Sequence, residues 1–178
     1  VGKSHETTPW TKPYKSIRLD RPGNQYTPND CTVGDVDGDG QYELVVKWNP
    51  RNAKDNSHKG TTDPVLIDCY RLDGARGGRI DLGQNIRAGA HYTQFLFYDF
   101  DGDGRSEMIC KTAPGSKDGM GHYITQAATD PAIHDVGDNE TDYRNNYGYI
   151  LEGPEYLTVF HGLTGKAIHT IFYQPNRA

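Results

Sequence analysis

The sequence predicts an all-β fold made of two copies of a four-stranded unit. A nine-residue acidic motif occurs twice, at 35–43 and 99–107, and each copy leads into a short apolar run of strand character. Gly (21), Tyr (12) and Pro (10) are abundant in 178 residues, which is typical of a turn-rich β protein, and no long segment shows helical periodicity. Four antiparallel strands with short returns are the unit of a β-propeller blade, so we expect two blades of a larger propeller.

Residues 1–26 are polar and contain several prolines, which predicts an extended lead-in from a preceding domain, with one strand near Ser16–Leu19. The first blade is expected at 27–94. Within it, Asn49–Pro64 is polar enough to be an exposed loop, and Asp73-Gly74 is a hairpin turn signal. Its four strands are expected at Cys31–Gly34, Tyr42–Trp48, Val65–Leu72 and Gly78–Leu82.

The second blade is expected at 95–178. It differs from the first by a long insertion at 112–154, which is rich in Gly, Asp, Asn and Tyr. A turn is expected at Leu163–Gly165. The four strands of this unit are expected at Phe95–Tyr98, Glu107–Lys111, Glu155–His161 and Ala167–Tyr173.

Two constant spacings support the repeat. A spacing of 64 residues separates Asp35 from Asp99, Glu43 from Glu107 and Lys47 from Lys111. A spacing of 91 residues separates Leu66 from Leu157, Gly74 from Gly165 and Ile80 from Ile171, so the second unit is longer by its insertion. Two blades alone leave open sheet edges, and we therefore expect the chain to be part of a larger protein whose remaining blades are its partners.

Each acidic motif places three aspartates at alternate positions and a glutamate four residues after the third. Calcium binds several oxygen ligands, often with one bidentate carboxylate, and glycines allow the loop to fold back on its ion. The glutamate comes at position 9 and leads into a strand, whereas an EF-hand has it at position 12 between helices. The motifs therefore predict at least two calcium ions in strand–loop–strand sites. The alternative is a solvated acidic turn that binds no ion. The presence of two copies argues against it, because chance does not readily produce the same motif twice.

Composition and charge limit the partners. The net charge of −5 argues against nucleic acid, which requires a basic face. No run approaches 18 apolar residues, so no membrane span is expected. Calcium is abundant outside the cell, which favours an extracellular location, although the first residues contain no signal-peptide core. Cys31, Cys69 and Cys110 lack metal spacing and follow apolar strand patterns, so we expect buried free thiols.

Several residues are candidates for chemistry. The segment Ile86–Thr93 links the two units and contains Arg87 and His91, which either contact an anionic sugar or clamp neighbouring backbone carbonyls. Lys47 and Lys111 occupy equal places in the repeat, which favours a structural countercharge to the acidic loops over a catalytic base. Aromatic residues that could stack on sugar rings are Trp48, equally suited to the core, and those of Tyr143–Tyr149.

Four segments resemble rhamnogalacturonan lyases of polysaccharide lyase family eleven: Thr27–Gly40, Val45–Trp48, Arg79–Phe95 and Glu152–Phe160. The resemblance covers roughly residues 15–178. It implies a secreted or periplasmic bacterial protein with an eight-bladed propeller that binds many calcium ions. By this resemblance the chain is the N-terminal part of that propeller, following a small N-terminal domain.

The resemblance also implies a reaction. Such lyases cleave the bond between rhamnose and galacturonate in pectin by β-elimination, which leaves an unsaturated uronate. Removing the C5 proton creates negative charge beside a carboxylate, so a cation must neutralise the carboxylate and a base must lie about 3 Å from the proton. The base is expected in blades that this chain lacks, and Lys47, Arg87 and His91 are weak candidates for it.

The site residues implied by the resemblance fall into two classes. Substrate contacts are expected at Asn29 and Asn49, where the family often has Asp at the second position. A further departure is Gly77-Gly78, where the family tends to have bulky residues. The metal ligands are expected to be Asp30, Asp35, Asp37, Asp39, the carbonyl of Gln41 and Glu43 for the first ion, and Asp99, Asp101, Asp103, the carbonyl of Arg105 and Glu107 for the second.

Two other functions remain open from the sequence. The first is a non-catalytic, calcium-stabilised propeller that binds carbohydrate or mediates adhesion. The second is a purely structural calcium repeat, in which replacing Asn29 would alter neither binding nor turnover.

Overall fold

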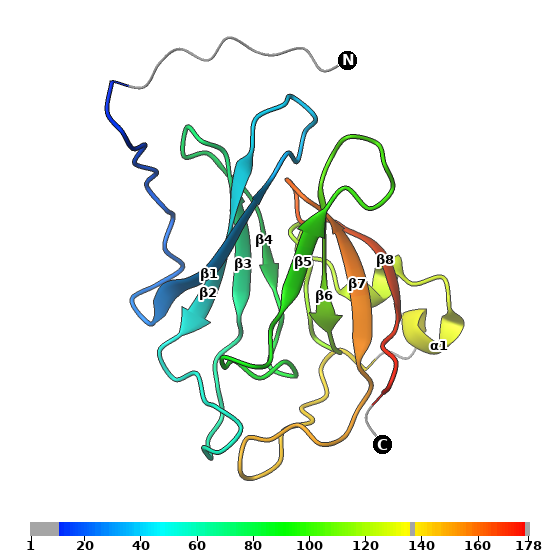
Figure 1. The fold of residues 1–178 in the computed structure, drawn as a ribbon. Coiled ribbons are helices and arrows are strands. Elements are labelled where there is room, and N and C mark those ends of the chain that lie inside the picture. Colours follow the sequence, from blue (N-terminus) through cyan, green and yellow to red (C-terminus); the bar gives the residue numbers. More distant parts are fainter. Residues whose placement is uncertain (1–10, 136–137, 177–178) are drawn as a thin grey trace.

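The computed structural model describes residues 11–135 and 138–176, which form two four-stranded antiparallel sheets (Figure 1). The all-β prediction is confirmed. The first sheet contains β1 (Tyr26–Gly34), β2 (Glu43–Pro50), β3 (Leu66–Tyr70) and β4 (Arg76–Asp81). The second contains β5 (Phe95–Tyr98), β6 (Glu107–Thr112), β7 (Tyr156–His161) and β8 (Ala167–Phe172). Between β6 and β7 lie a short 3-10 helix, η1 (Ile124–Ala127), and a short α-helix, α1 (Pro131–His134).

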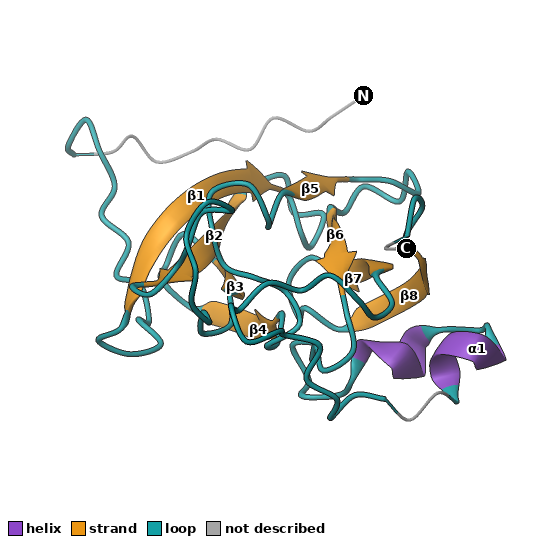
Figure 2. Ribbon diagram, turned by 90° about the horizontal axis from the view of Figure 1, so that it is seen from below, coloured by secondary structure: helices purple, strands orange, loops and turns teal. Residues whose placement is uncertain are grey.

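Each sheet is a meander in which every strand pairs with the next in sequence. The first strands of the two sheets, β1 and β5, lie next to each other, and α1 lies beside the second sheet near β8 (Figure 2). Both acidic loops extend from the upper end in Figure 1, and the connections after β2, β4 and β6 lie at the lower end. The described part contains no helix long and apolar enough to span a bilayer.

All eight strands predicted at 27–178 have a counterpart, but one expected near Ser16–Leu19 does not, since the described lead-in contains no strand there. The first strand is also longer than predicted, because Tyr26 and Thr27 already pair with the end of β2. A bulge between Pro28 and Cys31 interrupts that pairing. Because a bulge tolerates a proline, Pro28 lies within β1, whereas the sequence pattern began the strand after it, at Cys31.

Strand pairing confirms the 64-residue spacing and corrects the other. Leu44 pairs with Val33 and Met108 with Phe97, so the first two strands of each sheet repeat at 64. However, Lys47 pairs with Ile67 and its counterpart Lys111 pairs with Leu157. The third strand therefore repeats at 90 residues, with Ile67 and not Leu66 equivalent to Leu157. The spacing of 91 holds at Ile80 and Ile171, because the second hairpin is one residue longer.

The main core lies between the sheets. Val45, Ile67 and Ile80 of the first sheet belong to one buried cluster with Met108 and Phe160 of the second. Near β4 the backbones approach closely: the N–H of Gly78 donates to the carbonyl of Leu163 over 3.1 Å. A methyl group on Gly78 would overlap the carbonyl oxygen of Thr164, which explains why glycine occupies this position.

The other face of the first sheet buries a charged network. The side chain of Asp68 is fully buried, and its carboxylate accepts hydrogen bonds from Trp48 Nε1 (2.8 Å), Tyr70 Oη (2.8 Å) and Arg79 Nε (2.8 Å). The carbonyl of Asp20, in the lead-in, accepts from Arg79 Nη2 over 2.7 Å. Trp48 is thus a core residue, as one of its two interpretations predicted, and is not available to stack on a sugar.

At the equivalent positions of the second sheet, neutral hydroxyl groups replace this network. The hydroxyl of Thr158 lies 2.7 Å from that of Thr112 and 3.1 Å from that of Thr170, which donates to the carbonyl of Ile124 over 2.8 Å. These threonines face the first sheet and tie η1 to β8. The two units therefore share a backbone plan but satisfy their buried polar positions with different chemistry.

The far face of the second sheet exposes several large apolar side chains. Leu96 and Tyr98 of β5 are 64% and 68% exposed, and Ile171 of β8 is 46% exposed. Cross-strand pairing places Ile109 and Leu157 on this same face. An apolar sheet face of this kind usually contacts another element.

Candidate metal loops and the opposite end of the sheets

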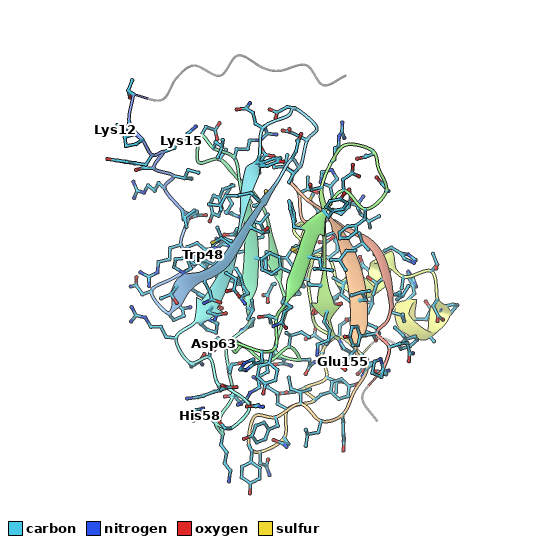
Figure 3. The ribbon with its side chains drawn as sticks, viewed as in Figure 1. Lys12, Lys15, Trp48, His58, Asp63 and Glu155 are labelled. Carbon is cyan, nitrogen blue, oxygen red and sulfur yellow. The ribbon has the colours of Figure 1, made fainter. Side chains whose placement is uncertain are left out.

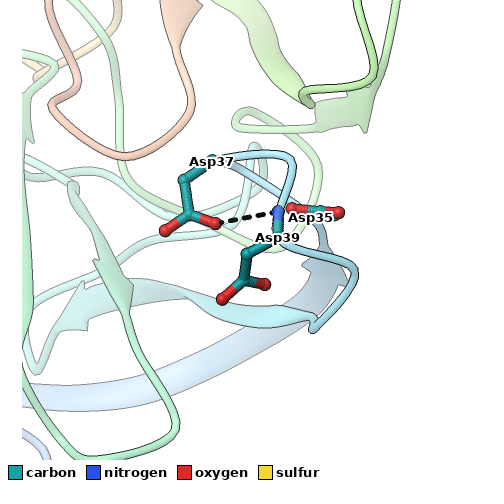
Figure 4. Close-up of side chains that lie close together, drawn as sticks. All are labelled: Asp35, Asp37 and Asp39. Atoms are coloured by element: carbon teal, nitrogen blue, oxygen red, sulfur yellow. Dashed lines mark hydrogen bonds between the residues drawn. The ribbon is translucent and has the colours of Figure 1, made fainter. Parts of the chain in front are cut away.

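The first acidic loop is organised by its own backbone. The carboxylate of Asp35 accepts from the N–H groups of Gly38 (2.7 Å) and Gly40 (2.8 Å), and Asp39 accepts from the N–H of Gln41 (2.8 Å). The N–H of Asp39 donates to Asp37 over 3.3 Å, so the three carboxylates converge (Figure 4). Gly38 and Gly40 have φ of 77° and 85°, a conformation that favours glycine.

The second loop repeats this pattern. Asp99 accepts from the N–H groups of Gly102 (2.7 Å) and Gly104 (2.9 Å), and Asp103 accepts from the N–H of Arg105 (2.8 Å). The N–H of Asp103 donates to Asp101 over 3.0 Å. Identical bonds at equivalent positions show that the motif itself determines the loop conformation.

The two loops are also joined to each other. The N–H of Ser106, at the end of the second loop, donates to the carbonyl of Asp35, at the start of the first, over 2.6 Å. The ring of Phe97 and the hydroxyl of Ser106 leave no room for a side chain at Gly34. The loops therefore lie side by side at one end of the sheets.

A glutamate closes each loop. Glu43 accepts from the N–H of Val36 and Glu107 from that of Phe100, each over 3.0 Å. Burial raises the pKa of Glu43, and the charges of nearby aspartates raise it further; burial likewise raises the pKa of Glu107. A bound cation would oppose both effects, since it favours the ionised carboxylate.

The donor sets fit a hard cation. Ligand oxygens of Asp35, Asp37 and Asp39 lie within 4.8 Å of one another, as do those of Asp99, Asp101 and Glu107. Two oxygens that each lie about 2.3–2.6 Å from one calcium ion can be no more than about 5.2 Å apart, so both sets are compatible with a shared ion. Glu43 and Asp103 belong to the same loops but fall outside these tightest groups.

Asp30 is placed differently from its expected role as a first-loop ligand. It lies in the bulge of β1 and forms an ion pair with Lys47, and it is not in the group formed by the loop aspartates. Lys47 is buried, and its Nζ also lies 3.5 Å from the carbonyl of Thr93. Lys47 thus neutralises Asp30 and not the acidic loop, and Lys111 pairs with Glu155 over 2.7 Å.

Arg71, which sequence analysis missed, forms an ion pair with the first loop. Its Nη2 lies 2.6 Å from Oδ2 of Asp37. Arg71 directly follows β3. Nothing in the sequence near the acidic motif indicates this contact, because Arg71 lies beyond the next two strands of the chain. Because this contact depends on the β2–β3 pairing, local spacing could not reveal it.

The candidate substrate residues lie at the end of the sheets away from the acidic loops. Asn29 is exposed in the β1 bulge, and Asn49 stands opposite Thr27 on the neighbouring strand. Among the described residues, neither the buried amide oxygen Oδ1 of Asn49 nor the buried hydroxyl of Thr93 has a hydrogen-bond partner. Buried polar atoms of this kind are normally satisfied, so water or a ligand is expected there.

The remaining candidate bases already have partners. Arg87 donates to the carbonyls of Gly60 (3.0 Å), Gly148 and His58, which is the backbone clamp that one interpretation foresaw. The Nδ1 of His91 lies 3.1 Å from Asp55 Oδ1, and its side chain is exposed. The residues around Arg87 lie at the lower end of the molecule, where Figure 3 labels His58 and Glu155.

The chain is similar in sequence to proteins of one known family. The model "Rhamnogalacturonan lyase family 11, C-terminal domain" matches residues 5–178. The rhamnogalacturonan endolyase YesW of Bacillus subtilis (strain 168) is 52% identical over 183 residues, which cover 98% of this chain and 28% of that protein. The rhamnogalacturonan exolyase YesX of the same organism is 53% identical over 169 residues, covering 95% of this chain and 26% of its own length.

Solved structures show the same fold. The crystal structure of YesW superimposes with a TM-score of 0.82 over 93% of this chain and 28% of that one, at 52% identity. A Bacillus licheniformis rhamnogalacturonan lyase also gives a TM-score of 0.82, over 92% of this chain and 28% of that one, at 53% identity.

The chain spans about a quarter of the length of the curated relatives it matches. The expectation named the N-terminal part of a propeller, whereas the matching model describes the C-terminal domain of the family. The family match covers nearly the whole chain and includes both acidic loops. The chain therefore belongs to rhamnogalacturonan lyase family 11, as the resemblance predicted, and to its C-terminal domain.

Proposed function

We propose that this chain is part of a calcium-dependent lyase that cleaves the rhamnogalacturonan backbone of pectin by β-elimination. The observation that carries the proposal is identity above 50% to both an endolyase and an exolyase over at least 95% of the chain. A secreted or periplasmic bacterial location follows from the same proposal, since an extended plant polysaccharide must be met outside the cytoplasm.

The proposed architecture is that of two blades in a larger propeller, with the remaining blades in the parent protein. Two sheets with the same strand order and adjacent first strands support it. The apolar face formed by Leu96, Tyr98 and Ile171 is where a third blade would pack. We expect the isolated chain to self-associate strongly through this face. The full-length protein should not self-associate in this way, because a third blade would cover the face.

The proposed role of calcium is structural. One ion would be held by Asp35, Asp37, Asp39, Glu43 and the carbonyl of Gln41, and a second by Asp99, Asp101, Asp103, Glu107 and the carbonyl of Arg105. When bound, calcium supplies the positive charge that holds these carboxylates together. Asp30 is assigned to Lys47 and not to the first ion, on the basis of their ion pair.

In this proposal, residues of this chain contact the substrate at the end of the sheets that lies away from the acidic loops. Asn29 is exposed there, and its amide can hydrogen-bond a sugar hydroxyl. Asn49, which is half-buried on the neighbouring strand, is the second proposed contact. The base that removes the C5 proton is assigned to the rest of the parent protein. Both terminal nitrogens of Arg87 donate to backbone carbonyls, so Arg87 is poorly suited to this task.

The lyase proposal is tested with the full-length parent protein and rhamnogalacturonan, by following the ultraviolet absorbance of the unsaturated uronate. The expected result is product formation that chelation abolishes and added calcium restores. Product formation that chelation does not affect would contradict the calcium dependence and leave the lyase intact. No product with calcium present would contradict the lyase.

The second candidate is a carbohydrate-binding propeller without catalysis. It is favoured by the ion pairs and hydrogen bonds that engage Lys47, Arg87 and His91. Retained binding of rhamnogalacturonan by the full-length protein, with no product, would support it. Asn29→Ala separates both functions from a purely structural calcium repeat, which predicts unchanged binding.

A further inference from the structure

The lead-in carries a basic strip, residues 11–21, along the outer side of the first sheet. The strip contains four basic residues and one acidic residue, Asp20, in a chain whose net charge is −5. All four basic side chains are exposed: Lys12, Lys15, Arg18 and Arg21. Figure 3 shows Lys12 and Lys15 on the side of the first sheet that faces away from the second. Positive charge is therefore concentrated on one side of an acidic chain.

Asp20 fixes the basic strip to the sheet. Its backbone carbonyl accepts a hydrogen bond from Arg79 Nη2 over 2.7 Å, and its N–H donates to the hydroxyl of Tyr70 over 3.2 Å. Its carboxylate pairs with Arg76 over 2.9 Å. Leu19 packs against the buried cluster that contains Tyr70. The strip is therefore held in place, and its one carboxylate already has a cationic partner on the sheet.

The basic strip covers the face by which one sheet of this fold packs on another. Asp68, on the outer face of the first sheet, is equivalent to Thr158 of the second. Thr158 shares a strand face with Phe160, which belongs to the core between the sheets. The Asp68 face is therefore the one on which a preceding sheet of the proposed ring would pack. The strip lies at this position, because Arg79 binds both Asp68 and the carbonyl of Asp20.

The two outer sides of the chain differ in chemistry. The far face of the second sheet exposes large apolar side chains such as Leu96 and Tyr98, whereas the basic strip presents ammonium and guanidinium groups. A neighbouring surface that covered these cations without supplying carboxylates would leave them desolvated and unpaired, which is costly. The chain therefore requires an apolar sheet face as its neighbour on one side and an acidic surface on the other.

We propose that the basic strip is an interaction surface for the neighbouring blade of the parent protein, and that this blade presents carboxylates to Lys15 and Arg18. The inference rests on the proposed function, since it takes the chain to be part of a larger propeller. An acidic polysaccharide would also attract four cations. The anchoring of the strip on a sheet face that a blade would cover favours a protein surface over a polysaccharide.

The test is zero-length carbodiimide cross-linking of the calcium-loaded, full-length parent protein, followed by peptide mass spectrometry. A carbodiimide joins an amine to a carboxylate only where the two are in contact, so the lysines of the basic strip report their partner directly. We expect Lys12 or Lys15 to be joined to an Asp or Glu of the neighbouring blade. Lys111 and Glu155, which lie 2.7 Å apart, are the internal control. A cross-link from the strip to any other part of the protein, or none while the control pair is joined, would overturn the proposal.

Charge reversal gives an independent measurement. Lys15→Glu/Arg18→Glu should lower the melting temperature of the parent protein by at least about 2 °C relative to Lys15→Gln/Arg18→Gln, because it sets glutamates against carboxylates. In the 178-residue chain, where the strip is exposed, the two variants should melt within about 1 °C of each other. Lys166→Glu, at an exposed position between β7 and β8, is the control and should leave the parent melt unchanged. Equal differences in both proteins, or no difference in the parent protein, would contradict the proposal.

The outcomes also separate this inference from the proposed function. If Lys15→Glu/Arg18→Glu binds rhamnogalacturonan more weakly than the Gln variant while both melt alike, the basic strip binds polysaccharide and the proposal is wrong. If the expected cross-link forms and no unsaturated product appears, the interaction surface stands and the lyase is wrong. If product appears and the lysines of the strip have no partner in the neighbouring blade, the lyase stands and the interaction surface is wrong.

Discussion

The guanidinium of Arg71 lies 2.6 Å from the carboxylate of Asp37, and this ion pair distinguishes the two acidic loops. The equivalent of Arg71 in the second sheet is His161, because each follows the strand residue that pairs with Leu44 or Met108. His161 Nδ1 is instead 3.3 Å from the N–H of Thr164, in its own turn. The first loop therefore has a protein cation close to its carboxylates, and the second has a turn contact in its place.

Arg71→Gln is expected to lower the melting temperature of the chelator-treated protein more than His161→Gln does. The reason is that Arg71 partly offsets repulsion within the first loop when calcium is absent. The pair is half-exposed, so its contribution is about 0.5 kcal/mol. Thermal melts in EDTA and in excess calcium check this. Equal shifts for the two variants in EDTA, or a larger Arg71 effect in calcium, would contradict it.

Asp101→Ala is expected to lower the melting temperature in calcium and to make the second loop insensitive to EDTA, since it removes one of three converging carboxylates. Asp63→Ala, at an exposed position between β2 and β3 and outside both acidic loops, is the matched control and should leave the melt unchanged. A wild-type melting temperature that is identical with and without EDTA would show that the acidic loops do not bind calcium.

Asp68→Asn is expected to destabilise the fold by about 3 kcal/mol, because it leaves Arg79 facing a neutral group in a site where the carboxylate is fully buried. Thr158→Val, at the equivalent position of the second sheet, should cost only about 1 kcal/mol, since it removes neutral hydrogen bonds. Urea denaturation of both variants measures the difference. Similar costs would mean that the charge contributes little.

Gly78→Ala is expected to destabilise by about 1–3 kcal/mol, because the added methyl group would overlap the carbonyl oxygen of Thr164 and force the sheets apart. The φ of Gly78 is not positive, so the cost arises from contact and not from backbone strain. Ser57→Ala, on an exposed loop, is the control for a neutral alanine substitution. An unchanged denaturation midpoint for Gly78→Ala would show that the sheets do not meet this closely.

One of the three thiols is expected to react with a disulfide reagent near pH 8 in the folded protein, and all three in denaturant. Burial raises the pKa of Cys69 and of Cys110 to about 12, so at that pH almost none of either thiol is ionised. Cys31 is exposed on β1, contrary to the expectation that all three are buried. Reaction of more than one thiol before unfolding would argue against the buried core.

The acidic loops could be predicted from the sequence because their geometry is local. The hydrogen bonds within each loop join residues at most seven positions apart, such as the one from the N–H of Val36 to Glu43. The eight strands were found for the same reason, since alternating apolar residues and turn signals are local patterns. The assignment of the family rested on the same segments.

The contacts that sequence analysis missed depend on pairing between strands. A hairpin one residue longer in the second unit moves the equivalent of Leu157 from Leu66 to Ile67, and a shift of one residue reverses the face of a strand. The pairing of Asp30 with Lys47 requires a bulge that no local pattern announces. Similarly, Arg87 reaches three carbonyls on two separate loops, which only the folded chain brings together.

The hydrogen bond from the N–H of Ser106 to the carbonyl of Asp35 joins the backbones of the two acidic loops directly. Distorting one of them displaces a backbone group of the other, so the two proposed calcium ions would be taken up and released cooperatively. A titration of this chain would then follow a curve steeper than that of two independent sites. In the proposed propeller, that coupling would let a narrow range of calcium concentration control the rigidity of both blades at once.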